Sequence, residues 1–513
     1  MKFNNPSHTS QSTSTSFNRE GHKVYKNSTK IEFASVLMNA MLKDKFYSSE
    51  EEQFEELEKW VDLLLKEGEE KFLCQSMAFV REHGKLRSVS HFLAVKIIEN
   101  VKGKSFVKKA LIKTIQRPDD MTEMVSLWNS RNPKKMIPNS LRKAMKFCLE
   151  TKWNEYHFKK YACKKCQVKL KDIVKLTHPK PKKFRDKDVF KKVIEDRLDN
   201  ISTAQTVNRL TGLERFYNYY EMLTKKQLGL MAALKNIKNI FKPYVEHQNS
   251  EEKNPYYDQS LLDEVYNSTI TELCKLFENK KAIEGSKVLP FRFLQAYEAL
   301  RDLSIDEFDK KRIKDSLNNG FKISCESVEI PGRTAILLDD SLSMAGKPFY
   351  YGKTILAAIA INNPNFVAYL WSDYCAKVDI DPIVNDPLGI TADLYPKGYG
   401  TFISKPFEEI TKTRTKLDNI VVLTDMQMYN MDSFGPKHQT LKSYFDKYKT
   451  ATGCNPKLVF WDLQGYGDGT PIKLSKDILE MSGISDKMVE LLPKLIESED
   501  FNFLVKEIES VEI

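Results

Sequence analysis

The stretch "TAILLDDSLSMAGKPFYYGKT" (334–354) decides the fold class of the C-terminal third of the chain. A short apolar run opens it, and oxygen-bearing side chains follow at Asp339, Ser341 and Ser343. Three more short apolar runs follow at spacings that leave room for helices: "FVAYLW" (366–371), "NIVVLT" (419–424) and "KLVFWD" (457–462). Runs of this kind are typical of parallel strands buried on both faces. We therefore predict a doubly wound α/β domain over 328–513, with ligands at the carboxyl ends of its strands.

The residues after the first run have the pattern of a cation site. In an extended chain alternate side chains point the same way, so Asp339, Ser341 and Ser343 can converge beyond the strand. Thr401 in "GYGTF" and Asp425 after "NIVVLT" are placed to complete the set from other strand ends. Oxygen donors suit a hard divalent cation, Mg²⁺ above all, which keeps several waters and can accept a partner's carboxylate or phosphate. The alternative is that these side chains are purely structural and hold no metal.

A nucleotide site is the rival interpretation of the same stretch. Gly352-Lys353-Thr354 resembles the end of a phosphate-binding loop, and Asp425 could serve as its strand-end carboxylate. The loop pattern G-x-x-x-x-G-K-[ST] requires its first glycine at position 347, where Lys347 stands, and bulky residues fill the turn. The spacing therefore favours the cation site, with Thr354 starting a helix.

The preceding part of the chain has helical periodicity. In "EFASVLMNAML" (32–42), apolar residues share one face at Phe33, Val36, Leu37, Ala40 and Met41. Similar stripes recur near 54–64, 91–99, 141–149, 206–224, 226–241, 259–277 and 291–303. No strand-like alternation interrupts this series from about residue 30 to 325, and we predict a helical-repeat domain over 17–327 after a disordered Ser/Thr-rich tail at 1–16. A single large globular helical domain is the alternative.

Composition narrows the class of protein. The 513 residues contain no run of the ~18 apolar residues that a membrane span needs. The N-terminus has no apolar signal core, so we expect a soluble, cytoplasmic protein without a membrane partner. The eight scattered cysteines indicate reduced thiols, and Cys163 and Cys166, the only CxxC pair, are a weak candidate for a metal knuckle. No G-x-S-x-G or H-E-x-x-H motif is present, so we expect no catalysis.

Positive charge is concentrated in one segment. Residues 151–192 hold 15 Lys and Arg against four acids, so the segment carries 15 − 4 = +11, whereas the whole chain carries +10. Such a concentration predicts a polyanionic partner. Its lysines exceed what one solvated helix face requires: Lys164, Lys165, Lys169, Lys171 and Lys175. The interleaved aromatics Tyr156, His157, Phe158 and Tyr161 could stack on bases, although most such residues belong to a helix core.

Two family resemblances follow from these motifs. D-x-S-x-S at Asp339, Ser341 and Ser343, with Thr401 and Asp425 in order, resembles the metal-ion-dependent adhesion site (MIDAS) of von Willebrand factor A domains. That resemblance implies a metal bound by the serines and threonine, with the aspartates acting in part through water. The sequence departs from the family at Asp340, an added carboxylate, and at Tyr399, where a glycine is common.

The helical half resembles the TROVE module of the Ro autoantigen family. The likeness is carried by "SLRKAM" (140–145), "KKYACKKCQVKLKDIVKLTHPKP" (159–181) and "LPFRFLQAYEAL" (289–300). It implies a monomeric ring of HEAT-like repeats that binds small noncoding Y RNA on its outside and takes the single-stranded 3′ ends of misfolded RNAs into its hole. The family's contacts to Y RNA carry over to Lys160, Lys164 and His178. Some bacterial relatives recruit an exoribonuclease, which is a possible protein partner here.

Three functions fit these observations. The leading hypothesis is a non-catalytic RNA-binding scaffold in a ribonucleoprotein. The second is a metal-dependent protein adaptor that binds no RNA, in which the basic segment is a solvated face. The third is a nucleotide-hydrolysing enzyme that uses Gly352-Lys353-Thr354 and Asp425.

Overall fold

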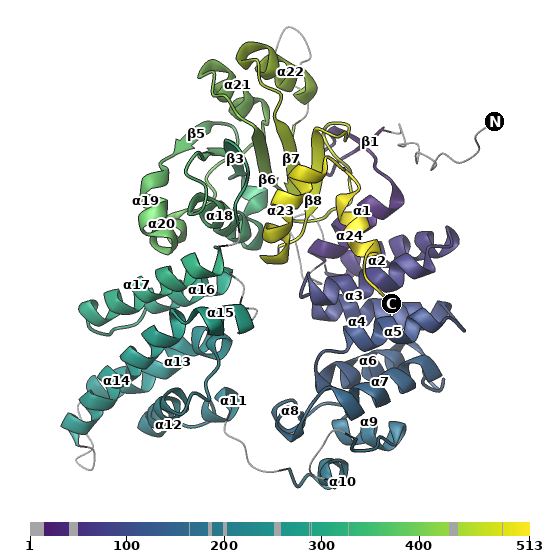
Figure 1. Cartoon of the computed structure of the whole chain (residues 1–513), viewed down its shortest axis with the longest axis vertical. Coiled ribbons are helices and arrows are strands. Elements are labelled where there is room, and N and C mark those ends of the chain that lie inside the picture. The colour runs from purple at the N-terminus through teal and green to yellow at the C-terminus, as the bar shows by residue number, and fades with distance from the viewer. Residues whose placement is uncertain are drawn as a thin grey trace.

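The chain is arranged as a ring of helices closed by an α/β unit (Figure 1). One arm of helices runs from α1 to α10, a second runs from α11 to α17, and the C-terminal sheet lies between the two arms. The computed structural model describes residues 15–40, 50–163, 165–182, 187–198, 203–250, 258–286, 288, 290–326, 328–429, 440–484 and 486–513. Within these ranges no helix combines the length and the apolar character needed to cross a bilayer.

The first arm is a stack of short helices. Its helices are α1 (Thr29–Asn39), α2 (Glu50–Lys66), α3 (Glu70–Glu82), α4 (Arg87–Asn100), α5 (Ser105–Thr114), α6 (Pro118–Arg131), α7 (Asn139–Thr151), α8 (Glu155–Lys160), α9 (Leu170–Thr177) and α10 (Val189–Ile194). Helices two apart in sequence pack side by side, as α3 on α5, α5 on α7 and α7 on α9. Each helix buries its apolar stripe between two neighbours, which is the packing of a helical-repeat array.

The second arm repeats this arrangement with longer helices. They are α11 (Ala204–Val207), α12 (Gly212–Thr224), α13 (Leu230–Gln248), α14 (Gln259–Phe277), α15 (Lys280–Ser286), α16 (Pro290–Arg301) and α17 (Glu307–Ser324). The predicted stripe at 259–277 coincides with α14. The predicted stripe at 206–224 divides into α11 and α12, because Gly212 with φ +53° begins a new helix. The prediction of successive packed helices is confirmed.

The C-terminal unit is a six-stranded sheet in the order β5-β4-β3-β6-β7-β8. Its strands are β3 (Thr334–Asp339), β4 (Val367–Trp371), β5 (Cys375–Val378), β6 (Asn419–Thr424), β7 (Lys457–Asp462) and β8 (Ile478–Ser482). All neighbours pair in parallel except β4 and β5, which are antiparallel. The helical elements are η1 (Leu342–Met344), α18 (Lys347–Ala360), α19 (Ile380–Asn385), α20 (Pro387–Asp393), α21 (Ser404–Lys412), α22 (Leu441–Thr452), α23 (Asp486–Ser498) and α24 (Phe503–Glu509). The four predicted strands are confirmed, and β4 begins one residue later than predicted.

A short hairpin that was not predicted precedes the first helix. β1 (Thr15–Phe17) pairs antiparallel with β2 (Lys23–Tyr25). Tyr25 exchanges backbone hydrogen bonds with Thr470 at 2.9 and 3.1 Å, so this hairpin docks on the C-terminal unit. Two residues of the predicted tail, Thr15 and Ser16, thus belong to a strand, and residues 1–14 lie outside the described part of the chain.

The C-terminal unit contacts both arms of helices. On one side α1 packs against β8 and α24, and α24 also packs on α3. On the other side α16 and α17 pack against α18 and α20. There Asn318 donates a hydrogen bond of 2.8 Å to Asp386, and Arg301 pairs with Asp393 at 2.8 Å. These two joints close the ring.

Candidate functional site

The five residues predicted to bind a cation lie around the carboxyl ends of neighbouring strands. Asp339 is the last residue of β3, and Asp425 directly follows β6. β3 and β6 pair in the middle of the sheet, at the point where the strand order reverses. Ser341 and Ser343 lie in the turn formed by η1. The sheet topology thus places both carboxylates at the same edge, where open α/β sheets hold their ligands.

Backbone hydrogen bonds bring the threonine loop to the same place. The amide of Leu342 donates to the carbonyl of Gly398 at 3.0 Å, and Ser341 forms a β-bridge with Gly398. The amide of Tyr429, beyond the end of β6, donates to the carbonyl of Thr401 at 2.9 Å. The loops that carry the serines, Thr401 and Asp425 are therefore joined to one another. We call Asp339, Ser341, Ser343, Thr401 and Asp425 the hydroxyl–carboxylate cluster.

Hydrogen bonds within the cluster orient its oxygens. Asp339 accepts from the Ser341 amide at 3.0 Å through Oδ1 and from the Thr424 hydroxyl at 2.7 Å through Oδ2. The hydroxyl oxygens of Ser341 and Ser343 lie 3.1 Å apart. The Gln427 amide donates to Oδ1 of Asp425 at 3.0 Å. All five side chains of the cluster are buried.

The two carboxylates are held in an environment that lacks positive charge. Burial, followed by the charge of Asp339, raises the pKa of Asp425 to about 8. Burial raises the pKa of Asp339 to about 6. Oδ2 of Asp425 is buried without a hydrogen-bond partner among the described residues. A divalent cation would satisfy this oxygen and offset the repulsion between the carboxylates, so the donor set fits a hard cation.

The donors in this cluster are mostly neutral hydroxyls. Within the described ranges no group of three or more His, Cys, Asp or Glu side chains could hold a metal ion. The cluster contributes only two carboxylates, so any metal there would depend on hydroxyl oxygens and water for its other ligands. Such a metal keeps residual positive charge, which favours a further acidic ligand from a partner.

The two departures from the MIDAS pattern have structural explanations. Asp340 is buried, and the Tyr374 hydroxyl donates a hydrogen bond to its Oδ2. Its backbone carbonyl accepts from the amides of Lys397 and Gly398 at 3.0 and 3.1 Å. Asp340 therefore fastens the loop that leads to Thr401. Tyr399 has 84% of its surface exposed and packs into no core.

The residues of the rival nucleotide site do not form a phosphate loop. Gly352, Lys353 and Thr354 all lie inside α18 and are buried. The ammonium group of Lys353 donates to the carbonyl of Leu394 at 3.2 Å and lies 3.7 Å from Glu298. The Thr354 hydroxyl donates to the Tyr350 carbonyl one turn back at 2.7 Å. The groups that would hold phosphate are thus engaged in packing the helix.

The predicted RNA contacts lie on α8, α9 and the loop between them. α9 buries the face formed by Leu170, Ile173, Val174 and Thr177. Lys171, Lys175 and His178 lie three and four residues apart, so they form one row on another face. His178 ends the helix in the left-handed conformation with φ +46°, which agrees with its predicted place just past a helix end.

The lysines of this surface are free of acidic partners. Among the described residues no carboxylate forms an ion pair with any of Lys160, Lys165, Lys169, Lys171 and Lys175. Lys165 and Lys175 are exposed, and the other three are half-buried. We call these five lysines together with His178 the basic face. Lys164 lies outside the described residues.

The aromatic residues of the segment divide between core and surface. Phe158 is fully buried and packs at 5.9 Å from the ring of Phe190. Tyr156 is 37% exposed, and the ammonium group of Lys160 lies 5.6 Å from its ring and 5.5 Å from that of Tyr161. The expectation of core packing therefore holds for Phe158, whereas Tyr156 has a face that a base could reach.

A second basic feature was missed by the sequence analysis. A groove of about 570 Å³ between the α4–α5 and α6–α7 loops is lined by five lysines: Lys102, Lys104, Lys108, Lys135 and Lys143. Glu99, the one acid that lines it, is hydrogen-bonded to Asn132 at 2.5 Å and to Arg131 at 3.2 Å. We call this feature the lysine groove. The run "VKGKSFVKK" (101–109) was a visible signal, but its partners come from another loop.

Helix α7 links the lysine groove to the basic face. Its first turn contributes Lys143 to the groove, and its body packs on α9. Its outer surface carries Arg142, Lys146 and Phe147, the last 44% exposed. Thirteen residues of α-helix span about 20 Å, so positive charge extends over at least that length.

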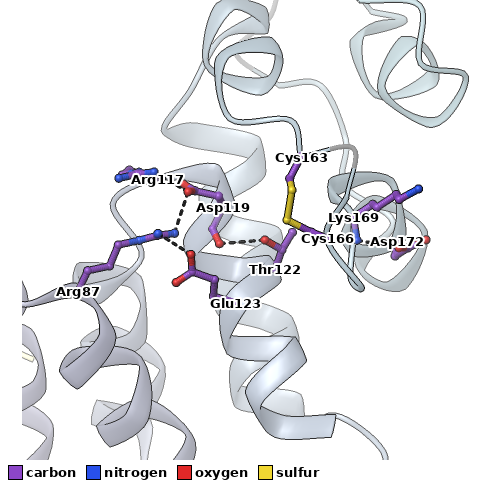
Figure 2. The surroundings of a disulfide bond; sticks show 9 residues. All are labelled: Arg87, Arg117, Asp119, Thr122, Glu123, Cys163, Cys166, Lys169 and Asp172. Atoms are coloured by element: carbon purple, nitrogen blue, oxygen red, sulfur yellow. Dashed lines mark hydrogen bonds and ion pairs between the residues drawn. A yellow bond between two sulfur atoms is a disulfide. The ribbon is translucent and has the colours of Figure 1, made fainter. Parts of the chain in front are cut away.

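The prediction that all cysteines are reduced is wrong at one pair. Cys163 and Cys166 form a disulfide that closes a turn in the α8–α9 loop (Figure 2). Their sulfurs are joined to each other, so they do not form a metal knuckle. The other six cysteines have free thiols, as predicted. Spacing could not decide between these states, because CxxC pairs occur both as metal ligands and as disulfides.

Comparison with known proteins identifies the fold. No protein-family profile matches this sequence, and no curated protein matches it. The crystal structure of the Deinococcus radiodurans Ro (RSR) protein matches it over 92% of this chain and 100% of that chain. The TM-score is 0.56 and the sequence identity is 14%. The chain therefore has the fold of that Ro protein, a ring of helical repeats closed by a von Willebrand factor A-like unit.

Proposed function

We propose that the protein is a non-catalytic scaffold that binds RNA. The observation that carries the proposal is the basic face, where five lysines project from α8, α9 and their loop without carboxylate partners among the described residues. The lysine groove and α7 extend the same charge. Several neighbouring lysines without carboxylate partners fit a phosphate backbone better than a small anion. The shared fold with a Ro protein supports RNA as the polyanion.

The proposed ligands are small structured RNAs, namely Y RNA and misfolded RNA with a single-stranded 3′ end. Proteins recognise A-form RNA by its shape, phosphates and 2′-hydroxyls, because its major groove is too narrow for side chains. The row formed by Lys171, Lys175 and His178 is suited to phosphates, and Tyr156 can stack on an unpaired base. A monomeric ring in the cytoplasm would then carry such RNA as a ribonucleoprotein.

Charge reversal on the basic face tests this proposal. The variant carries Lys165→Glu, Lys171→Glu and Lys175→Glu, and filter binding to a hairpin RNA with a 3′ tail is measured from low to high salt. Each lost phosphate contact lowers the slope of log K against log salt by about 0.7 to 0.9, so the slope should fall by about 2 to 3. Affinity at low salt should fall by at least about tenfold.

A matched control separates a specific surface from overall charge. Lys405, Lys412 and Lys416 are exposed lysines of the α/β unit, and their reversal to glutamate changes the net charge equally. This control should keep nearly all of the wild-type affinity and slope. Equal losses in the two variants, or weak salt-independent binding by the wild type, would reject the RNA scaffold.

We further propose that the hydroxyl–carboxylate cluster binds Mg²⁺ and captures an acidic group of a protein partner, such as a recruited exoribonuclease. The buried oxygen of Asp425 without a hydrogen-bond partner among the described residues favours this second role. Calorimetric titration of the chelator-treated protein with Mg²⁺ and Mn²⁺ tests it. Binding should disappear in Ser343→Ala, and the absence of binding in the wild type would exclude the metal-dependent adaptor.

A further inference from the structure

We propose that the Cys163–Cys166 disulfide is a redox modification site, which a cellular dithiol reduces and which sets how firmly the basic face holds its ligand. The effect on ligand binding rests on the RNA-binding function proposed above. The thiol–disulfide chemistry itself does not depend on that function. The two parts therefore have separate readouts.

The disulfide is isolated and accessible. Cys166 is exposed, Cys163 is half-buried, and the neighbouring Ala162, Lys165 and Gln167 are exposed. The other six cysteines are free thiols, so this bond belongs to no disulfide framework. In the reducing cytoplasm proposed above for this protein, disulfides are usually transient and either catalytic or redox-sensing. An attacking thiol can reach this bond without unfolding the protein.

Three of the remaining thiols are poor competitors in exchange. Burial raises the pKa of Cys74 to about 12 and that of Cys148 to about 11. Burial also raises the pKa of Cys375 to about 12. The thiolate is the reactive form, so these three groups stay inert near neutral pH and do not compete with the CxxC pair.

Charged side chains of both signs surround the disulfide. Lys165 and Lys169 flank the pair in the chain, and Figure 2 shows the acids nearby. Asp119 is paired with Arg87 at 2.8 Å and with Arg117 at 2.5 Å. Glu123 also pairs with Arg87, and Asp172 accepts the amide of Lys169 at 2.9 Å. Asp119 and Glu123 are thus engaged by arginines, and the neighbouring Lys165 and Lys169 supply positive charge that speeds thiol–disulfide exchange.

The disulfide constrains a loop whose two ends are held independently. At one end the Arg117 guanidinium lies 4.5 Å from the ring of Tyr161. At the other end Leu170 and Ile173 anchor α9 in the core. Val168 packs against the hydrophobic core, whereas Lys165, Cys166 and Gln167 form no backbone–backbone hydrogen bond with other described residues, so the disulfide is the main restraint on these three.

Reduction therefore frees Lys165 and leaves α8 and α9 packed. A freed lysine must be ordered again when it binds phosphate, which costs affinity. We expect RNA affinity to fall by about three- to tenfold on reduction. Lys171, Lys175 and His178 keep their row on α9, so binding is weakened and not abolished.

The proposed reaction is balanced as a two-electron exchange with a dithiol. One thiolate of the dithiol attacks the sulfur of Cys166, and the S–S bond breaks to release Cys163 as a thiolate, which takes up a proton. The second thiol of the dithiol then attacks the mixed disulfide, and Cys166 leaves as a thiolate that is protonated in turn. The dithiol ends as a cyclic disulfide and the protein as two thiols, with two electrons and two protons transferred.

The test uses the full-length protein equilibrated with reduced and oxidised dithiothreitol in varied ratios. Mass spectrometry after alkylation counts thiols, and hydrogen exchange reports on residues 162–168. The same samples are assayed by filter binding to the hairpin RNA. We expect mild reduction to add two alkylated cysteines at 163 and 166, to increase exchange in the loop, and to lower affinity reversibly by about three- to tenfold.

Two variants make the result specific. Cys163→Ser with Cys166→Ser should bind RNA as the reduced wild type does and should not respond to the redox buffer. Cys454→Ser removes a half-buried free thiol and should respond as the wild type does. The modification site is overturned if the pair resists mild reduction or if loop exchange is unchanged by it. If RNA binds equally in both redox states, only the regulatory consequence fails, and if RNA binds in neither, the proposed function fails with it.

Discussion

Replacing Glu480 with glutamine should tighten the joint between α1 and β8 above neutral pH. Glu32 on α1, Asp462 at the end of β7 and Glu480 on β8 are all buried at this joint. Asn27 bridges two of them, since its amide donates to Glu32 at 2.9 Å and its side chain donates to Glu480 at 3.2 Å. The Ser35 hydroxyl donates to Asp462 at 2.8 Å. No cation is among the groups that shift the pKa of Glu32 or of Glu480.

The pKa shifts give the sign and size of the effect. Burial, with a smaller contribution from the charge of Asp462, raises the pKa of Glu32 from 4.5 to about 7. Burial, and then the charge of Glu32, raises the pKa of Glu480 well above its ordinary value. A group with a raised pKa gives stability that is complete below its unfolded value and is lost as pH rises through its folded value. A shift of 7 − 4.5 = 2.5 for Glu32 corresponds to about 3 kcal/mol.

Hydrogen exchange can measure this loss at the joint itself. Amides of α1 (Thr29–Asn39) and β8 (Ile478–Ser482) are followed at pH 5.5 and 8.0, with intrinsic rates corrected. At pH 5.5 part of this stability is already lost, so the remaining loss spans about 7 − 5.5 = 1.5 pH units, or about 2 kcal/mol, and increases the opening equilibrium of the wild-type joint about 30-fold by pH 8.0. In Glu480→Gln the increase should be smaller than in the wild type, because the loss that comes from the titration of Glu480 itself is removed while that of Glu32 remains. The amide remains able to accept the hydrogen bond from Asn27.

An exposed acid provides the control for this prediction. Glu497 is exposed on α23, and its replacement by glutamine should leave the pH dependence of exchange unchanged. The reasoning is refuted if protection of α1 and β8 in the wild type does not vary with pH. It is also refuted if Glu480→Gln shows the same pH dependence as the wild type.

Three further predictions address the metal site and the core. In thermal melts, magnesium at 100 times its dissociation constant should stabilise the wild type by about 2.7 kcal/mol, and Asp425→Asn should abolish this stabilisation. The prediction is contradicted if a chelator leaves the melting temperature of the wild type unchanged. Gly398→Ala should weaken divalent-ion binding by at least about tenfold in calorimetry. The added Cβ would come 1.9 Å from the Ser372 hydroxyl and would displace the loop that carries Thr401. Unchanged affinity would show that this loop does not position a ligand. Phe158→Ala should lower the free energy of unfolding by about 3 to 5 kcal/mol in urea titrations, because the ring of Phe158 is fully buried between α8 and α10. A loss below about 1 kcal/mol would show that this segment is loosely packed.

The sequence predicted the strands whose burial is uniform and missed those whose burial is mixed. β3 and β6 are buried along their whole length and appear as unbroken apolar runs. β5 is an edge strand with two exposed residues, and β8 includes the buried Glu480, so neither has an apolar run that spacing could reveal. β1 has three residues and is held by its contact with the C-terminal unit, a restraint that local sequence does not contain.

The candidate sites show the same division between local and long-range information. Asp339, Ser341 and Ser343 form a contiguous motif, and strand ends placed Thr401 and Asp425, so the hydroxyl–carboxylate cluster could be assembled from sequence. The lysine groove could not be assembled from sequence, because its lysines come from two loops that are brought together by the packing of α5 on α7. The CxxC pair was visible, but its oxidation state depends on how the turn places the two sulfurs.

The two joints that close the ring differ in kind, and this difference predicts where the ring opens. The joint of α16 and α17 with the α/β unit has neutralised contacts, such as Arg301 with Asp393 and the ring of Phe291 at 5.1 Å from that of Tyr351. The joint of α1 with β8 buries three carboxylates, and burying charge without a counter-charge is costly. Rising pH should weaken this second joint, because buried acids with raised pKa values face one another there. We therefore expect the ring to open at the α1–β8 joint when the pH rises.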